Sequence, residues 1–184
     1  ADAEKDHAKI RTTFHHGLFL CTVLGFSLFA VLYFAKPIME WLDQPKEVIV
    51  LAKPFLNWVA FSLIPLVIYQ AYKQFADGLS MTKYSMYAIL MANVLHIILN
   101  YLLIYGIWIF PKLGILGAAL GTVISRIAMV VFMHFILAKK EKLNPYFHQF
   151  SFQEIKKETI IKISRLGFPS AMQMLFEVVL FTAA

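Results

Sequence analysis

The residues of this 184-residue chain that can do chemistry are polar side chains inside long apolar segments. In one segment Asn93, His96 and Asn100 fall within about 60° of one another on a helix, because each residue advances the helix by about 100°. Polar groups in an apolar helix are costly to insert, so they indicate a specific role. Two interpretations stay open, namely hydrogen bonding between helices and the lining of a polar cavity. His96 has no second ligand at a zinc-like spacing, which disfavours a metal site.

A second apolar segment carries small residues and one arginine. Gly117, Gly121 and Ser125 recur every four residues, a pattern typical of close helix packing in membranes. Arg126 lies on the opposite face, about 18 Å along the helix from Gly114 at about 1.5 Å per residue. An arginine at that depth needs a water-filled cavity, a partner or a path to lipid phosphate.

A third apolar segment contains a carboxylate. Pro169, Gln173 and Glu177 are four residues apart and share one helix face, with Glu177 about 18 Å beyond Arg165. The proline frees a backbone carbonyl and permits bending. Because desolvation disfavours its charged form, Glu177 is expected to be protonated or paired. Such groups recur in proton relays and cation pathways, and an ion pair with Arg126 is the simpler alternative.

Five segments are long enough to cross a bilayer as helices, since about 20 apolar residues span about 30 Å of hydrocarbon. They are 14–34, 48–71, 84–109, 114–138 and 160–184. They do not alternate as strands do, and backbone groups in lipid must bond within their own segment. With 60% hydrophobic and 15% charged residues, the composition excludes an ordinary soluble enzyme. We therefore predict an all-α, polytopic transmembrane helical bundle.

Basic residues divide unevenly between the two ends of these segments. Twelve lysines and arginines fall on the side that holds the start of the chain and the linker 139–159, and four fall on the other side. Cytoplasmic loops carry the excess of Lys and Arg, so we predict that the basic loops are cytoplasmic in a multi-pass inner-membrane protein. The net charge of +6 then reflects orientation in membrane lipids and not nucleic-acid binding.

Three stretches together resemble one family. Residues 95–106 followed by 111–126 resemble the fifth and sixth helices of MATE (multidrug and toxic compound extrusion) transporters. Residues 165–181 resemble the seventh helix, especially in the NorM-type branch, and residues 1–7 resemble the loop after the second helix. The resemblance covers essentially the whole chain.

The resemblance implies part of a twelve-helix transporter of the MOP superfamily, built from two six-helix lobes. Residues 1–138 would supply helices three to six of the N-terminal lobe, 139–159 the cytoplasmic inter-lobe linker, and 160–184 the first helix of the C-terminal lobe. The remaining helices of the same transporter would be its partners. The family's cation-coupling positions fall on Glu177, His96 and Asn100, with histidine where an amide is common in the NorM-type branch. Supporting positions for the cavity or for packing are Asn93, Thr122, Arg126, Pro169 and Gln173.

The resemblance implies a secondary active multidrug efflux antiporter and not an enzyme. It would export amphipathic or cationic organic compounds in exchange for Na⁺ or H⁺ by alternating access. No cofactor is expected, and no metal beyond Na⁺ near Glu177. A lipid-linked saccharide flippase of the same superfamily is an alternative, which the single deep cation Arg126 disfavours. A membrane-embedded enzyme using His96 and Glu177 as an acid–base pair is a further alternative, and it would act without an ion gradient.

Overall fold

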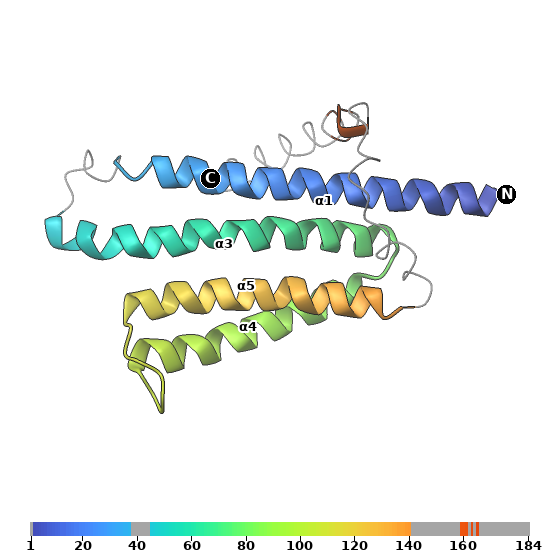
Figure 1. Ribbon diagram of the computed structural model, residues 1–184. Coiled ribbons are helices and arrows are strands. Elements are labelled where there is room, and N and C mark those ends of the chain that lie inside the picture. Colours follow the sequence, from blue (N-terminus) through green and yellow to red (C-terminus); the bar gives the residue numbers. More distant parts are fainter. Residues whose placement is uncertain (1, 38–44, 141–158, 162, 164, 166–184) are drawn as a thin grey trace, which may run out of the picture. The chain divides into compact units, whose positions relative to one another are not determined.

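The computed structural model describes residues 2–37, 45–140, 159–161, 163 and 165. Its main elements are four helices, α1 (Asp2–Phe34), α3 (Lys46–Gly78), α4 (Thr82–Tyr105) and α5 (Ile115–Ala138), as Figure 1 shows. In α1 the stretch Ile10–Phe34 is long and apolar enough to cross a membrane, and so are the other three helices over their whole length. These helices confirm the all-α class and four predicted spans. The fifth predicted span, 160–184, lies almost entirely outside the described residues.

The chain divides into two compact units. One combines Ala1–Leu20 with Tyr146–Ala184, and the other is Cys21–Pro145. Helix α1 contributes to both units, and the second unit also contains α3, α4 and α5. The predicted lobe and linker boundaries at residues 138 and 159 stay a prediction.

Within the second unit, α5 lies between α3 and α4 (Figure 1). The contact between α4 and α5 is close because α5 presents glycine to it. A Cβ atom on Gly117 would come within 2.6 Å of the backbone carbonyl of Leu103, and one on Gly121 would clash with the Asn100 side chain. Small residues permit such approaches in lipid, where there is no hydrophobic force between helices. The predicted role of the glycine stripe in helix packing is confirmed.

The C-terminal part of α1 packs on α3 in a similar way. A Cβ atom on Gly25 would lie 3.1 Å from the Cα atom of Ile64. One helical turn further along α1, the ring of Phe29 meets Phe61 edge to face, with ring centroids 6.2 Å apart. Glycine thus allows the two backbones to approach, and an aromatic pair packs between the same helices one turn further along.

A tight turn joins α3 to α4. Ser80 has a φ of 57°, and the N–H of Met81 donates to the carbonyl of Ala76 at 2.8 Å while the N–H of Ser80 donates to Asp77 at 3.0 Å. This is the Schellman arrangement, which satisfies the last carbonyls of a helix. Because these carbonyls are bonded, α3 continues to Gly78, seven residues beyond the predicted end at residue 71.

Helix α4 ends at Tyr105, so the predicted end at residue 109 is wrong. Gly106 has a φ of 69°, and its N–H donates to the carbonyl of Leu102 at 3.0 Å. The apolar run continues to Ile109, but the left-handed residue turns the backbone away. The N–H of Leu113 then donates to the carbonyl of Leu103 at 3.0 Å, which folds the loop back onto α4.

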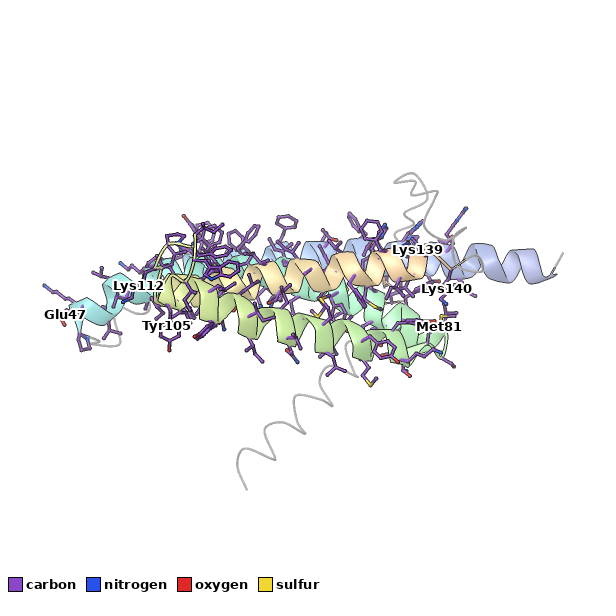
Figure 2. All side chains as sticks on the ribbon, turned by 90° about the horizontal axis from the view of Figure 1, so that it is seen from below. Glu47, Met81, Tyr105, Lys112, Lys139 and Lys140 are labelled. Carbon is purple, nitrogen blue, oxygen red and sulfur yellow. The ribbon has the colours of Figure 1, made fainter. Side chains whose placement is uncertain are left out.

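The second unit has two ends, which we call the Met81 end and the Tyr105 end. Figure 2 shows Lys139 and Lys140 at the Met81 end, whereas Lys112 and Glu47 lie with Tyr105 at the other. In the described part of this unit each end carries four lysines, Lys73, Lys83, Lys139 and Lys140 at one and Lys36, Lys46, Lys53 and Lys112 at the other. The uneven charge that predicts the orientation therefore comes from residues elsewhere in the chain, and the orientation stays a prediction.

Candidate functional site

A polar network joins α4 to α5 within their membrane-spanning lengths. Nε2 of His96 lies 3.1 Å from Oγ1 of Thr122 and 3.3 Å from Nδ2 of Asn100. His96 is nine residues before the end of α4 at Tyr105, which places it about 14 Å along the helix from the Tyr105 end. The structure thus brings together His96, Asn100 and Thr122, three of the predicted site residues.

The hydrogen bonds of this network make opposite demands on one nitrogen atom. The Thr122 hydroxyl donates to the carbonyl of Ala118 at 2.9 Å, so Oγ1 is free to accept a proton from Nε2 of His96. The Asn100 amide nitrogen, on the other hand, needs an unprotonated Nε2 as its acceptor. A single Nε2 atom satisfies one of these contacts at a time. Two arrangements of the same three side chains therefore differ in whether Nε2 of His96 carries a hydrogen, which depends on the tautomer of a neutral ring as well as on protonation.

The amide of Asn100 has an unused acceptor that suits the arrangement in which Nε2 of His96 carries a hydrogen. Its Oδ1 atom is buried without a hydrogen-bond partner and lies against Gly121. Turning the amide by half a rotation would bring Oδ1 to the place of Nδ2, where it accepts from a protonated Nε2 of His96. A buried amide oxygen without a partner costs about 1–3 kcal/mol, and this turn would give Oδ1 a donor when Nε2 carries a hydrogen.

Arg126 extends to α3, on the side of α5 away from the glycine stripe. Its Nη1 donates to the Ser62 hydroxyl at 2.5 Å, and Ser62 in turn donates to the carbonyl of Val59 at 2.6 Å. Ser62 is fully buried. Among the residues that the structure describes, no carboxylate lies within ion-pair distance of Arg126. Sequence analysis identified the need for a partner but gave no sign that it is Ser62, because an isolated serine is common in apolar helices.

Two further polar contacts join the helices nearer the Met81 end, and sequence analysis missed both. The Tyr72 hydroxyl lies 3.0 Å from Nδ1 of His134, which links α3 to α5. The Tyr69 hydroxyl donates to the carbonyl of Ser85 at 3.1 Å, which links α3 to α4. In the sequence these contacts could be suspected only from a tyrosine or histidine within one or two turns of a span end. Such residues are frequent at membrane interfaces in any case, so their presence does not indicate a contact between helices.

Among the described residues, the predicted site residue Asn93 does not join the network. Asn93 is exposed, although it lies only one turn before His96. Glu177, Pro169 and Gln173 lie outside the described residues, so their roles stay predictions. Within the described ranges, no group of three His, Cys, Asp or Glu side chains is placed to hold a metal ion.

Comparison with known proteins places this chain in a family. The MatE family model matches residues 3–102, more than half of the chain. The chain belongs to the MatE family. It is 29% identical over 173 residues to the multidrug resistance protein NorM of Vibrio cholerae, covering 94% of this chain and 38% of the relative. It is also 29% identical over 172 residues to a probable multidrug resistance protein NorM of Bacillus licheniformis, covering 90% of this chain and 37% of the relative.

The fold of this MatE chain also matches a solved structure. That structure is the inward-facing conformation of a multidrug resistance MATE family transporter of the MOP superfamily, with a TM-score of 0.72 and 21% identity. The match covers 85% of this chain and 35% of the solved one. The expected family is therefore confirmed, and the described helices share the fold of that structure. The MatE chain is an integral membrane protein from a family of transporters and not of enzymes, and it spans about two fifths of the length of its relatives.

Proposed function

We propose that this MatE chain is part of a secondary active multidrug exporter. The complete protein exchanges amphipathic or cationic organic compounds for Na⁺ or H⁺ by alternating access, with its basic loops in the cytoplasm. The proposal is supported by four helices able to span a membrane and by relatives named for multidrug resistance. Residues 1–138 then belong to the N-terminal lobe and residues 160–184 begin the C-terminal lobe.

The polar network of His96, Asn100 and Thr122 is the observation that carries this proposal. It places an imidazole ring between two spans, and the hydrogen-bond partner of Nε2 changes with whether that nitrogen carries a hydrogen. A coupling site must bind a cation in one conformation and release it in another. A network that rearranges when one proton binds is suited to that task, and the unpaired Oδ1 of Asn100 is an oxygen ligand that Na⁺ also accepts.

We assign the second part of the coupling site to Glu177, supported by its place in a segment that resembles the seventh helix of the NorM-type branch. A carboxylate in an apolar span exchanges a cation readily, because its charged form is disfavoured there unless it is paired. Pro169 and Gln173 share its predicted face. Arg126 has a different role in this proposal, since its contact with Ser62 ties α5 to α3.

Efflux from proteoliposomes tests the proposal. The full-length protein is reconstituted with a fluorescent organic cation inside, and either a Na⁺ or a proton gradient is applied. Asn100→Leu removes the amide from the network and is expected to lower gradient-driven efflux at least tenfold. Asn93→Leu is the matched control, because it removes the same group from an exposed position of the same helix. Wild-type efflux by Asn100→Leu would reduce the network to a packing contact.

Replacing His96 identifies the ion. His96→Gln keeps a hydrogen-bonding side chain but removes the titratable ring. If the N-terminal lobe couples to protons, this variant loses proton-driven efflux and keeps any Na⁺-driven efflux. Full retention of proton-driven efflux would contradict a proton-binding role for His96.

A further inference from the structure

Two lysines from different helices converge on one tyrosine at the Met81 end. Nζ of Lys83, in the first turn of α4, lies 5.6 Å from the centroid of the Tyr84 ring. Nζ of Lys140, two residues after the end of α5, lies 5.2 Å from the same centroid. Both distances are within the range of cation–π attraction, which holds the flexible side chains toward the ring. Because both distances are measured to the same centroid, the two ammonium groups can be no farther apart than the sum of the two distances.

Neither ammonium group has an acidic partner among the residues that the structure describes. Lys73 at the same end does pair, with Asp77 at 3.0 Å, so the acidic group of the α3–α4 turn is already engaged. The Ser85 hydroxyl donates to the other oxygen of Asp77 at 3.2 Å. Lys83 and Lys140 are both exposed. They form a doubly positive site at the edge of the membrane, which fits an anion.

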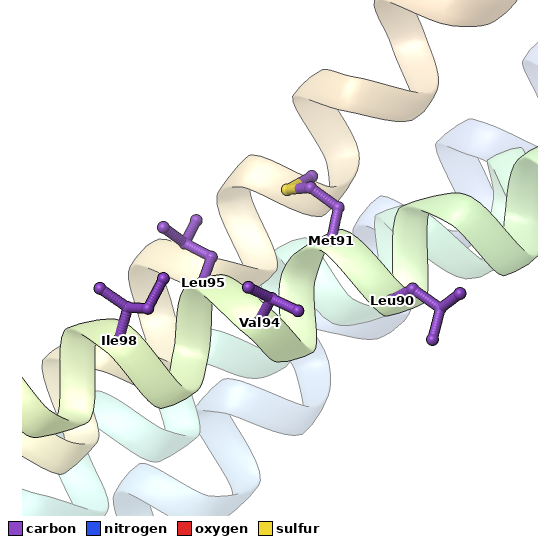
Figure 3. A pocket seen from close by; sticks show the side chains of 5 residues that line it. All are labelled: Leu90, Met91, Val94, Leu95 and Ile98. Carbon is purple, nitrogen blue, oxygen red and sulfur yellow. The ribbon is translucent and has the colours of Figure 1, made fainter.

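An apolar groove lies on α4 further toward the Tyr105 end. Its volume is about 410 Å³, and Figure 3 shows the five side chains that line it, Leu90, Met91, Val94, Leu95 and Ile98. Leu90 is seven residues from Lys83, and Met91 is seven from Tyr84, so groove and charges share one face of the helix. At about 1.5 Å per residue, the groove begins about 10 Å from Lys83 and extends about 12 Å toward the Tyr105 end.

We propose that this face of α4 binds an anionic phospholipid of the leaflet at the Met81 end. The phosphate lies between Lys83 and Lys140, and one acyl chain lies in the groove lined by Leu90, Val94 and Ile98. A charged head followed by an apolar tail along the membrane normal is the shape of a lipid and not of a soluble anion. Basic pockets between transmembrane helices bind anionic head groups in this way, and the double positive charge selects them over zwitterionic ones.

This inference depends on the membrane-spanning fold and not on transport, so its test measures lipid binding. The full-length protein is stripped of lipid in detergent, and its affinity for dioleoyl phosphatidylglycerol is compared with that for dioleoyl phosphatidylcholine by native mass spectrometry. The wild type is expected to prefer phosphatidylglycerol. Replacing both lysines, Lys83→Gln with Lys140→Gln, is expected to weaken phosphatidylglycerol binding about 30-fold, which corresponds to about 1 kcal/mol for each lysine. Lys112→Gln is the control, since it removes a lysine from the Tyr105 end.

A second pair of variants tests the groove. Val94→Trp fills the groove and is expected to weaken phosphatidylglycerol binding at least fivefold. Ile97→Trp adds the same ring to an exposed neighbour that does not line the groove, and it should have no such effect. Competition with inorganic phosphate distinguishes a lipid site from a simple anion site, since phosphate should displace little lipid.

Three outcomes would overturn the proposal. One is equal affinity for the two lipids. Another is unchanged phosphatidylglycerol binding when both lysines are replaced, which is expected if other helices of the full-length protein cover this face. The third is full displacement by inorganic phosphate together with normal binding by Val94→Trp, which would leave an anion site without a lipid. Melting temperatures of the variants, measured beside the wild type, establish that each one folds.

Discussion

An alanine at position 117 probes the closest approach of α4 and α5. Its Cβ atom would lie 2.6 Å from both the carbonyl carbon and the oxygen of Leu103, which are backbone atoms and cannot turn aside. The two helices must move apart to admit it. Overpacking lowers the free energy of unfolding by about 1–3 kcal/mol. Because the atoms in the way belong to the backbone, we expect a cost near the upper end, about 3 kcal/mol. Alanine recovers about 1 kcal/mol because it favours a helix more than glycine does. We therefore expect Gly117→Ala to lower the free energy of unfolding by about 2 kcal/mol.

Two other glycines provide matched comparisons. The Cβ atom of Gly121→Ala would clash with Oδ1 of Asn100, the end of a side chain that can rotate away. The strain of about 1 kcal/mol is then offset by helix preference, and the stability changes little. The rotation takes Asn100 from His96, so efflux is expected to fall although the protein is stable. At Gly17 no atom lies within 4 Å of the new Cβ atom, and alanine should stabilise α1 by up to about 1 kcal/mol.

The assay is reversible unfolding of the full-length protein in mixed micelles, followed by efflux from proteoliposomes. The expected order of stability is Gly17→Ala above the wild type, Gly121→Ala close to the wild type, and Gly117→Ala lowest. A Gly117→Ala protein as stable as the wild type would refute the argument from backbone contact. Normal efflux by Gly121→Ala would refute the link between the glycine stripe and the polar network.

Three further predictions concern orientation, coupling and packing. Single cysteines at Gln44 and Gln149, in a protein without its native cysteine, should react with an impermeant thiol reagent from opposite sides of the membrane, and reaction of both from outside would overturn the topology. Glu177→Gln should abolish gradient-driven efflux without lowering Tm, whereas lost stability that Arg126→Leu restores would assign the carboxylate to an ion pair instead. Tyr72→Phe should lower the free energy of unfolding by about 0.6 kcal/mol, the average for a hydrogen bond between transmembrane helices, and an unchanged unfolding curve would show that the hydroxyl contributes nothing.

The four described spans were predictable because hydropathy measures the property that lets a helix cross lipid. Their ends were less predictable, since backbone geometry and not hydropathy determines them. Helix α4 stops at Tyr105 within an apolar run because Gly106 takes a left-handed conformation. Helix α3 continues past its apolar run to Gly78 because Lys73 and Asp77 pair across one turn and the α3–α4 turn bonds its last carbonyls.

The candidate site was predictable in its members and not in its contacts. Periodicity placed Asn93, His96 and Asn100 on one stripe, but the stripe is wider than the contact with α5. Asn93 falls at its exposed margin, whereas His96 and Asn100 meet α5. A projection of one helix shows which residues share a face, but it does not show on which side the neighbouring helix lies. The same limit applies to Arg126, whose partner lies 64 residues earlier in the chain.

The position of α5 between α3 and α4 has a consequence for how these helices keep their register. Glycine contacts are smooth, and lipid is as apolar as leucine, so apolar packing alone gives little resistance to sliding along the helix axis. Polar pairs resist sliding, because a shift of one turn would leave their atoms without partners in hydrocarbon. Helix α5 has such pairs at three depths, with His96, with Ser62 and with Tyr72. These pairs fix the axial position of α5 relative to α3 and α4. Of the three, the pair with α4 is the one whose hydrogen bonds change with the hydrogen on Nε2 of His96.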